Sequence, residues 1–188
     1  SRRQDQDADP IVLRRLQNLG GPGLLLFVVL LSFALIDWAM SLQPAWFSTV
    51  FSAMVIVGFV VTALAFAIVV LYFVADREPL AELAVPKYVL DLGNMLFTFL
   101  FLWVYMQFSQ LLIVWSGNLS EEIPWYVSRL QGSWEAVTML LALLAFAVPF
   151  AALLGRKRKR NLRSLAKLAA FVLVIRLLTT IWIVEPAF

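Results

Sequence analysis

Histidine and cysteine are both absent from this sequence of 188 residues. Without cysteine, the chain can form no disulfide and can hold no iron–sulfur cluster through its own thiolates. Without histidine, it offers no imidazole ligand for haem, copper or zinc. The two absences exclude a cytochrome b-type subunit and any metal centre ligated by His or Cys of this chain, so we expect no cofactor in the chain itself.

Charged residues are also scarce, at 14%, whereas hydrophobic residues make up 62% of the chain. An ordinary soluble domain is about 45–50% apolar. A soluble core formed by a chain of this length could not hide so much apolar surface, so lipid must be the solvent for much of it. The composition therefore predicts an all-α, polytopic membrane protein.

Five apolar stretches are long enough to be transmembrane helices. A helix that crosses hydrocarbon about 30 Å thick needs about 20 mostly apolar residues. The stretches lie at about 24–42, 47–75, 88–116, 134–155 and 164–184. Residues 1–23 are expected to form a cytoplasmic segment, with a Gly-Gly-Pro-Gly run at 20–23 before the first helix. Short links favour antiparallel neighbours, hence an up-down bundle of about five helices.

Lysine and arginine are distributed very unevenly between the predicted loops. One side carries nearly all of them: Arg2, Arg3, Arg14, Arg15, Arg77, Lys87, Arg156, Lys157, Arg158, Lys159, Arg160, Arg163 and Lys167. The positive-inside rule places this side, and the N-terminus, in the cytoplasm. The run at 156–160 (RKRKR) is interpreted as a topology anchor that contacts anionic lipid, because it lies between two membrane helices. No nucleic-acid partner is expected.

A polar stripe follows one face of the third predicted helix. Its members are three, four or seven residues apart, which places them on a common side: Asp91, Asn94, Thr98, Tyr105 and Ser109. Intramembrane carboxylates are costly and usually face protein or water. The stripe therefore predicts either a static hydrogen-bonded seam between helices or a path for protons from the cytoplasm. Both interpretations place it in the bundle interior.

Two opposite charges lie at similar depth in the first and fifth helices. At 1.5 Å per residue, Asp37 and Arg176 are about 20 Å and about 18 Å from the inner ends of their helices. If their faces meet, an ion pair is expected, either as a static clamp or as a pair that opens during turnover. The alternative places Asp37 in water at the outer mouth of its helix.

The predicted outer loop combines acidic and aromatic residues with one cation. Glu121, Glu122, Trp125 and Arg129 are candidates for docking an extrinsic partner or a lipid headgroup. The alternative interpretation is a solvated loop that contacts no partner.

Several short segments of the sequence match one known family. They are DWAMSLQPAWFST at 37–49, DLGN at 91–94, WVY at 103–105, FSQ at 108–110, VW at 114–115, NLSEE at 118–122 and WY at 125–126. Together they resemble the NrfD-like, or polysulfide-reductase-like, membrane subunits of bacterial alternative complex III, in particular the C-terminal half of the ActF type. The resemblance covers about residues 37–134.

The resemblance implies a cofactor-free subunit of a quinol:electron-acceptor oxidoreductase in the bacterial inner membrane. Such a subunit supports assembly and is a candidate for proton conduction. Its partners would be the other subunits of the complex, which carry haem and iron–sulfur clusters, and a second NrfD-like subunit, which is usually credited with the quinol site. Family members have about twice as many helices, so this chain would correspond to the second half.

Two other functions compete with this interpretation. A purely structural membrane anchor would have the same composition, with every buried polar group static. A small independent transporter is less consistent with the sequence, because transporters often show internal repeats and broken helices. Neither feature is visible here, and five helices is an awkward number for such a protein.

Overall fold

The computed structural model describes residues 10–43, 46–77, 84–118, 120 and 122–184. Every regular element in this part of the chain is a helix, and five of the helices are long and apolar enough to cross a membrane. The predicted all-α membrane fold is thereby confirmed. In chain order the elements are α2 (Pro10–Trp38), η1 (Met40–Leu42), α3 (Phe51–Val74), α4 (Pro86–Gly117), α5 (Ile123–Leu130), α6 (Ser133–Leu154), α7 (Arg156–Arg160) and α8 (Leu162–Val184).

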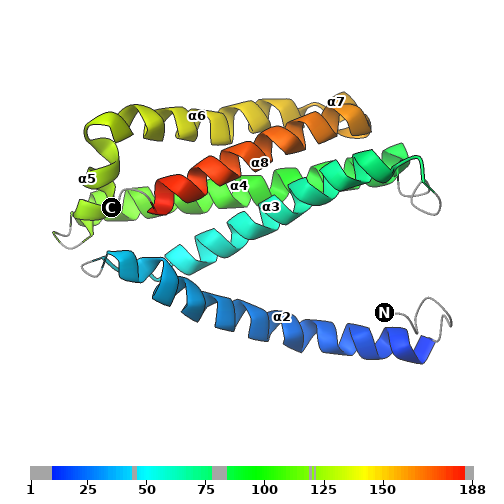
Figure 1. Cartoon of the computed structure of the whole chain (residues 1–188), viewed down its shortest axis with the longest axis horizontal. Helices are drawn as coiled ribbons and strands as arrows, with labels where there is room; N and C mark the ends of the chain where they lie inside the picture. Colours follow the sequence, from blue (N-terminus) through cyan, green and yellow to red (C-terminus); the bar gives the residue numbers. More distant parts are fainter. Residues whose placement is uncertain (1–9, 44–45, 78–83, 119, 121, 185–188) are drawn as a thin grey trace.

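The four helices α3, α4, α6 and α8 form the body of the molecule (Figure 1). Helix α3 lies between α4 and α8, and its inward side chains are fully buried at Val61, Ala65 and Ile68. Helix α8 presents Ala166 and Ala169 to the same core. Small residues at these positions let the backbones approach closely, which is the usual basis of helix association within a membrane.

Helix α2 leaves the bundle and contacts it near its C-terminal end (Figure 1). Every side chain from residue 14 to residue 30 is exposed, and Leu35 is the buried one among the described side chains of α2. The hydroxyl of Ser52 on α3 donates a hydrogen bond to the carbonyl of Ser32 at 3.3 Å. Most of the apolar surface of α2 is therefore uncovered by this chain.

The start of α2 differs from the sequence prediction. The helix begins at Pro10 and not at about residue 24, and it continues through Gly20, Gly21 and Pro22 without a break. Proline removes one backbone donor, but long membrane helices tolerate it when the remaining backbone hydrogen bonds persist. The glycine-rich run is consequently part of a helix and does not separate an N-terminal segment from it.

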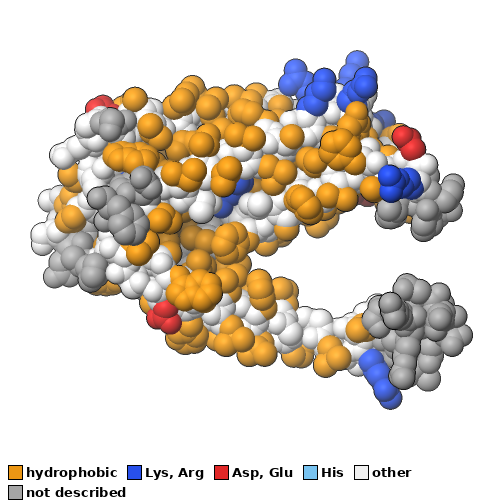
Figure 2. Space-filling model, viewed as in Figure 1, with side chains coloured by type: hydrophobic (Ala, Val, Ile, Leu, Met, Phe, Trp, Pro, Cys, Tyr) orange, Lys and Arg blue, Asp and Glu red, His pale blue; other side chains and the backbone are white. Residues whose placement is uncertain are grey.

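Most basic residues of the described chain gather at one end of the molecule, whereas Arg129 lies in α5 at the other end and Arg176 lies within α8. Figure 2 shows the clustered residues around α7 and at the N-terminal end of α2. The long helices alternate in direction, so links that are far apart in the sequence meet at the same end. Arg2 and Arg3 lie outside the described residues. The cytoplasmic assignment of this end is a prediction from the distribution of lysine and arginine.

Two short helices replace predicted loops. The outer link contains α5, and the RKRKR run forms the single-turn helix α7. Four residues of α7 are exposed, whereas Lys159 is buried against α4. Its Nζ donates a hydrogen bond to Oδ1 of Asn94 at 2.8 Å, and its aliphatic stem packs on Gly93. The basic run therefore also fastens the α6–α8 link to the bundle.

Candidate functional site

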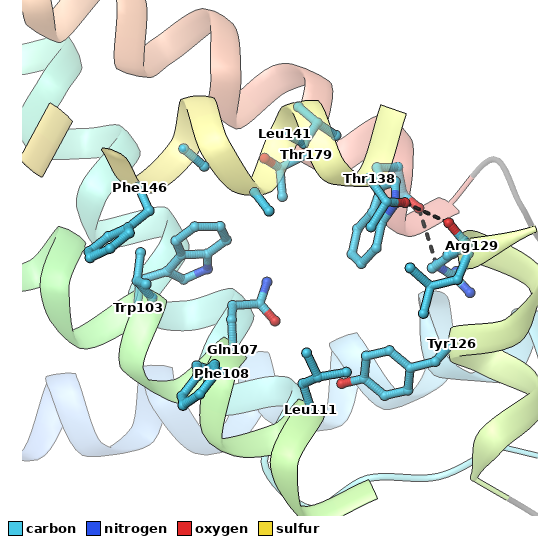
Figure 3. A pocket seen from close by; sticks show the side chains of 15 residues that line it. Trp103, Gln107, Phe108, Leu111, Tyr126, Arg129, Thr138, Leu141, Phe146 and Thr179 are labelled. Atoms are coloured by element: carbon cyan, nitrogen blue, oxygen red, sulfur yellow. Dashed lines mark hydrogen bonds between the residues drawn. The ribbon is translucent and has the colours of Figure 1, made fainter. Parts of the chain in front are cut away.

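A cavity of about 330 Å³ lies between α4, α6 and α8, at the end of the bundle where α5 links α4 to α6 (Figure 3). Farther along the bundle, the ring of Phe150 on α6 contacts those of Phe97 and Phe101 on α4, with centroids 5.6 and 6.4 Å apart. Toward α5 the gap is not filled, and the cavity occupies it. Its volume falls within the range of small-molecule sites, about 300–1,000 Å³.

The cavity is lined mainly by apolar and aromatic side chains, with a few polar groups. The apolar wall comprises Val104, Phe108, Leu111, Leu130, Leu141, Ala142, Ala145 and Phe146. The remaining lining residues carry a polar atom: Trp103, Gln107, Tyr126, Arg129, Thr138, Thr179 and Trp182. Phe108 is 56% exposed and Leu130 is 42% exposed, so the mouth opens sideways, toward the space that lipid would occupy.

Arg129 fastens α5 to the C-terminal end of α8. The side chain is only 1% exposed. Its Nη2 donates to the carbonyl of Ile183 at 2.7 Å, Nε donates to the carbonyl of Trp182 at 3.3 Å, and Nη1 donates to the carbonyl of Trp125 at 2.8 Å. A cation at a helix C-terminus satisfies unpaired carbonyls and complements the helix dipole. Arg129 thus stabilises one wall of the cavity.

Aromatic rings surround this arginine. Its guanidinium lies 3.8 Å from the centroid of the Trp125 ring and 5.5 Å from that of Trp182, within cation–π range. Trp46 stacks on Trp125, with centroids 4.8 Å apart. The indole N–H of Trp182 donates to the hydroxyl of Thr138, which itself donates to the carbonyl of Arg129 (Figure 3). These contacts join α5, α6, α8 and the chain before α3 into one rigid corner.

Burial changes the ionisation of two residues of α5. Burial raises the pKa of Tyr126 to about 12; the Arg129 cation acts against this shift and Glu122 adds to it. Burial also lowers the pKa of Arg129 to about 10, against the effect of the Tyr126 phenol, which raises it. At neutral pH the phenol is therefore a neutral hydrogen-bond donor and the arginine is a cation.

Two polar side chains that point into the cavity remain available. Figure 3 shows the amide of Gln107 and the ring of Tyr126 directed toward its centre. The figure marks no hydrogen bond between either polar group and the other lining residues. The hydroxyl of Thr138, in contrast, is already engaged on both sides. Gln107 and Tyr126 are therefore the groups best able to bind an occupant.

Arg176 lies behind the cavity, in the middle of α8. It is 5% exposed, packs over the Trp103 ring at 4.6 Å from the centroid, and contacts Gly58 on α3. Its Nε and Nη1 atoms are buried without a hydrogen-bond partner among the described residues. A small space of about 10 Å³ adjoins it and shares Trp103, Gln107 and Trp182 with the large cavity.

The possible ion pair between Asp37 and Arg176 is not formed in this structure. Asp37 is exposed near the C-terminal end of α2, and its backbone carbonyl accepts a hydrogen bond from Ser41. Arg176 instead faces α3 and α4 within the bundle. Similar depth along two helices does not determine their rotation, and α2 diverges from the bundle rather than crossing α8.

The polar stripe on α4 faces outward, so its predicted position in the bundle interior is wrong. Asp91, Asn94, Thr98 and Tyr105 are exposed, and Ser109 is half-buried. The interior face of α4 comprises other residues: Val89, Gly93, Leu96, Leu100, Trp103, Gln110 and Val114. Residue spacing shows which side chains share a face. The apolar faces of α3 and α6, together with the stem of Lys159 on Gly93, bury the other side of α4.

The predicted docking residues of the outer link have mixed positions. Trp125 and Arg129 are buried and hold α5 in place, so neither is available to a partner. Glu122 is half-buried, and Glu121 lies outside the described residues. Sequence reasoning did not single out the cavity, because its lining comes from four helices. Among the sequence features considered, the doublet Trp125-Tyr126 is the one that lies nearest to the cavity.

No group of three or more Asp, Glu, His or Cys residues that could hold a metal ion occurs in the described part of the chain. A scan against protein-family models finds no match for the sequence, and a search of curated proteins finds no similar one.

Proposed function

We propose that this chain is a cofactor-free membrane subunit of a larger complex, namely a quinol:electron-acceptor oxidoreductase of the alternative complex III type in a bacterial inner membrane. The outward-facing carboxylate of Asp91 carries the argument for a subunit, because Asn94 and Thr98 of the same stripe already have hydrogen bonds within the chain. Polar groups on the surface of a membrane helix are costly in lipid unless a protein partner or water satisfies them. The assignment to this particular complex rests on the sequence resemblance.

The exposed surface of α2 supports the same proposal. This helix contributes almost no buried area to the bundle over its first two-thirds. Membrane helices gain stability from packing against other helices. A neighbouring subunit that packed against both α2 and the stripe of α4 would cover the two surfaces that this chain leaves open, and the second NrfD-like subunit is the proposed neighbour.

Copurification tests the proposal most directly. The tagged chain, isolated from its native membrane in mild detergent, should bring with it subunits that show the absorbance of haem and iron–sulfur clusters. An Asp91→Leu variant should lose these partners, because the carboxylate no longer meets its partner group. A Phe101→Leu variant, changed at an exposed apolar position of the same helix, should retain them. Isolation of the wild-type chain alone, without partners, would contradict the proposal.

Proton conduction along the stripe is the second part of the proposal. With the stripe on the outer face of α4, the path would run between this chain and its neighbour. Asp91→Asn keeps the size and hydrogen-bonding capacity but removes the titratable group. In the assembled complex, we expect quinol turnover to continue while proton uptake falls. If turnover and proton uptake are both unchanged, the stripe is a static seam and the chain is an anchor.

A further inference from the structure

The cavity beside α5 has features of a binding site that the proposed function does not use. It combines a laterally open apolar chamber with two unoccupied polar groups, Gln107 and Tyr126. We propose that it binds a lipophilic molecule through an uncharged carbonyl oxygen, held by these two side chains while its tail extends into the membrane. This inference does not depend on which complex the chain joins.

The polar groups favour a hydrogen-bond acceptor. The phenol of Tyr126 and the amide of Gln107 can both donate a hydrogen bond to one oxygen. Arg176 lies behind Gln107, across the small space that adjoins both residues, and it adds positive potential. No carboxylate lines the cavity among the described residues. A cationic head group would therefore find no ion-pair partner among them.

The lining favours an uncharged head group over an anion. Arg129 is the cation on the cavity wall; it is 1% exposed, and each of its three nitrogens already donates to a carbonyl, of Trp182, Ile183 or Trp125. Arg176 does not itself reach the large cavity. An anionic head group would consequently lose its hydration without gaining a direct ion pair, which is unfavourable in an apolar site.

The shape of the cavity explains the preference for a lipophile. Exposed Phe108 and Leu130 flank an opening that faces sideways rather than along the bundle axis. A molecule dissolved in the membrane could enter there with its tail outside and its head group inside. Aromatic residues Trp103 and Trp182 would contact a flat head group. The carbonyl could belong to a quinone-type ring or to the ester of a lipid.

Tryptophan fluorescence provides the test. The full chain is reconstituted in nanodiscs of a dialkyl ether phospholipid, which contains no ester carbonyl. A benzoquinone with a decyl tail is then titrated, and saturable quenching is expected because Trp103 and Trp182 line the cavity. Dioctanoylglycerol and decanoate are tested as competitors. Strong displacement of the benzoquinone by dioctanoylglycerol, the diester, identifies a lipid ester as the preferred source of the carbonyl. Weak displacement identifies the quinone-type ring.

Variants locate the binding. Gln107→Leu should raise the dissociation constant about tenfold through loss of one hydrogen bond. Ala142→Phe, which narrows the cavity, should weaken binding by about tenfold or more. The matched controls are Tyr105→Phe on α4 and Ala151→Phe on α6, both at exposed positions away from the cavity. Neither control should alter binding, and thermal unfolding of each variant verifies that it is folded.

Three results would overturn the inference. The first is quenching that does not saturate. The second is saturable quenching that Gln107→Leu leaves unchanged; this variant nearly conserves volume and is decisive even if Ala142→Phe does not fold. The third is decanoate binding more tightly than both carbonyl compounds, because this would identify an anion site.

Discussion

Arg129 is a buried cation whose hydrogen-bonding needs are met by backbone carbonyls and aromatic rings. Three of its contacts reach carbonyls, two of them at the C-terminal end of α8. A planar guanidinium is suited to this role, because it donates in several directions at once and stacks on an indole. The residue therefore contributes mainly to stability, and its position on the cavity wall follows from that role.

Replacing Arg129 with Met should lower the free energy of unfolding by about 3 kcal/mol, since several charge-assisted hydrogen bonds are lost together. Arg129→Lys should recover part of this loss, because an ammonium group can satisfy fewer of the carbonyls. Thermal unfolding in detergent measures both effects. Arg163→Met is the control, since Arg163 is an exposed arginine of α8. Equal effects of Arg129→Met and Arg163→Met would contradict the structural role.

Tyr126 and Arg129 should have opposite effects on stability at high pH. The unfolded chain loses the tyrosine proton near pH 10, whereas folded Tyr126 keeps it until about pH 12. The unfolded state then binds fewer protons, so this residue makes stability fall as pH rises from 10 to 12. Folded Arg129 releases its proton near pH 10, well before the same arginine does in the unfolded chain, so its contribution to stability rises with pH above 10.

Tyr126→Phe removes the contribution of the phenol to stability, which falls with pH, and leaves that of Arg129, which rises with pH. Relative to wild type, the variant should gain about 2 kcal/mol of stability between pH 10 and 12. Thermal unfolding of both proteins across this range tests the prediction. Tyr88→Phe, at an exposed position of α4, is the control and should show no such gain. A difference in stability between wild type and Tyr126→Phe that does not change with pH would show that burial does not shift the pKa of the phenol.

Among the elements, α3 and α8 are in contact at Gly58, where the side chain of Arg176 lies against the α3 backbone. A Cβ atom at this position would clash with the guanidinium of Arg176. Glycine costs about 1 kcal/mol relative to alanine in a helix interior, so its presence here is explained by the space that the arginine needs. The α3–α8 contact thus holds the buried cation against Trp103 on α4.

Gly58→Ala should lower the free energy of unfolding by about 1–3 kcal/mol through overpacking, despite the better helix propensity of alanine. Gly21→Ala is the matched control, because a Cβ there meets open space; it should be neutral or slightly stabilising. Adding Arg176→Leu to Gly58→Ala should remove most of the clash, which a double-mutant cycle would detect as coupling. Equal stability of Gly58→Ala and Gly21→Ala would exclude the steric conflict between a Cβ atom at residue 58 and Arg176.

For the whole molecule, the clustering of cations at one end sets the expected orientation. The wild-type chain has no cysteine, so single-cysteine variants can report each end separately. Lys157→Cys should react with a membrane-impermeant maleimide in inverted vesicles, and Glu135→Cys, at the α5 end, should react in intact spheroplasts. Both residues are exposed. Labelling of the Lys157→Cys variant from the periplasmic side would reverse the predicted topology.

Composition and periodicity determined the membrane class, the number of spanning helices and the shared faces along each helix. These properties depend on hydrophobicity and on distances within one element, so a single sequence contains them. The same local information correctly grouped the polar residues of α4. It also indicated that Arg176 lies within a membrane helix.

Only the tertiary structure decided which faces meet. Helix rotation depends on the sum of packing contacts with neighbours far away in the sequence, so spacing could not predict that the stripe of α4 faces outward or that Asp37 and Arg176 are apart. The same reason applies to the cavity. Gln107, Tyr126, Thr138 and Trp182 come from four separate helices, and only the placement of α5 between α4 and α6 brings them together.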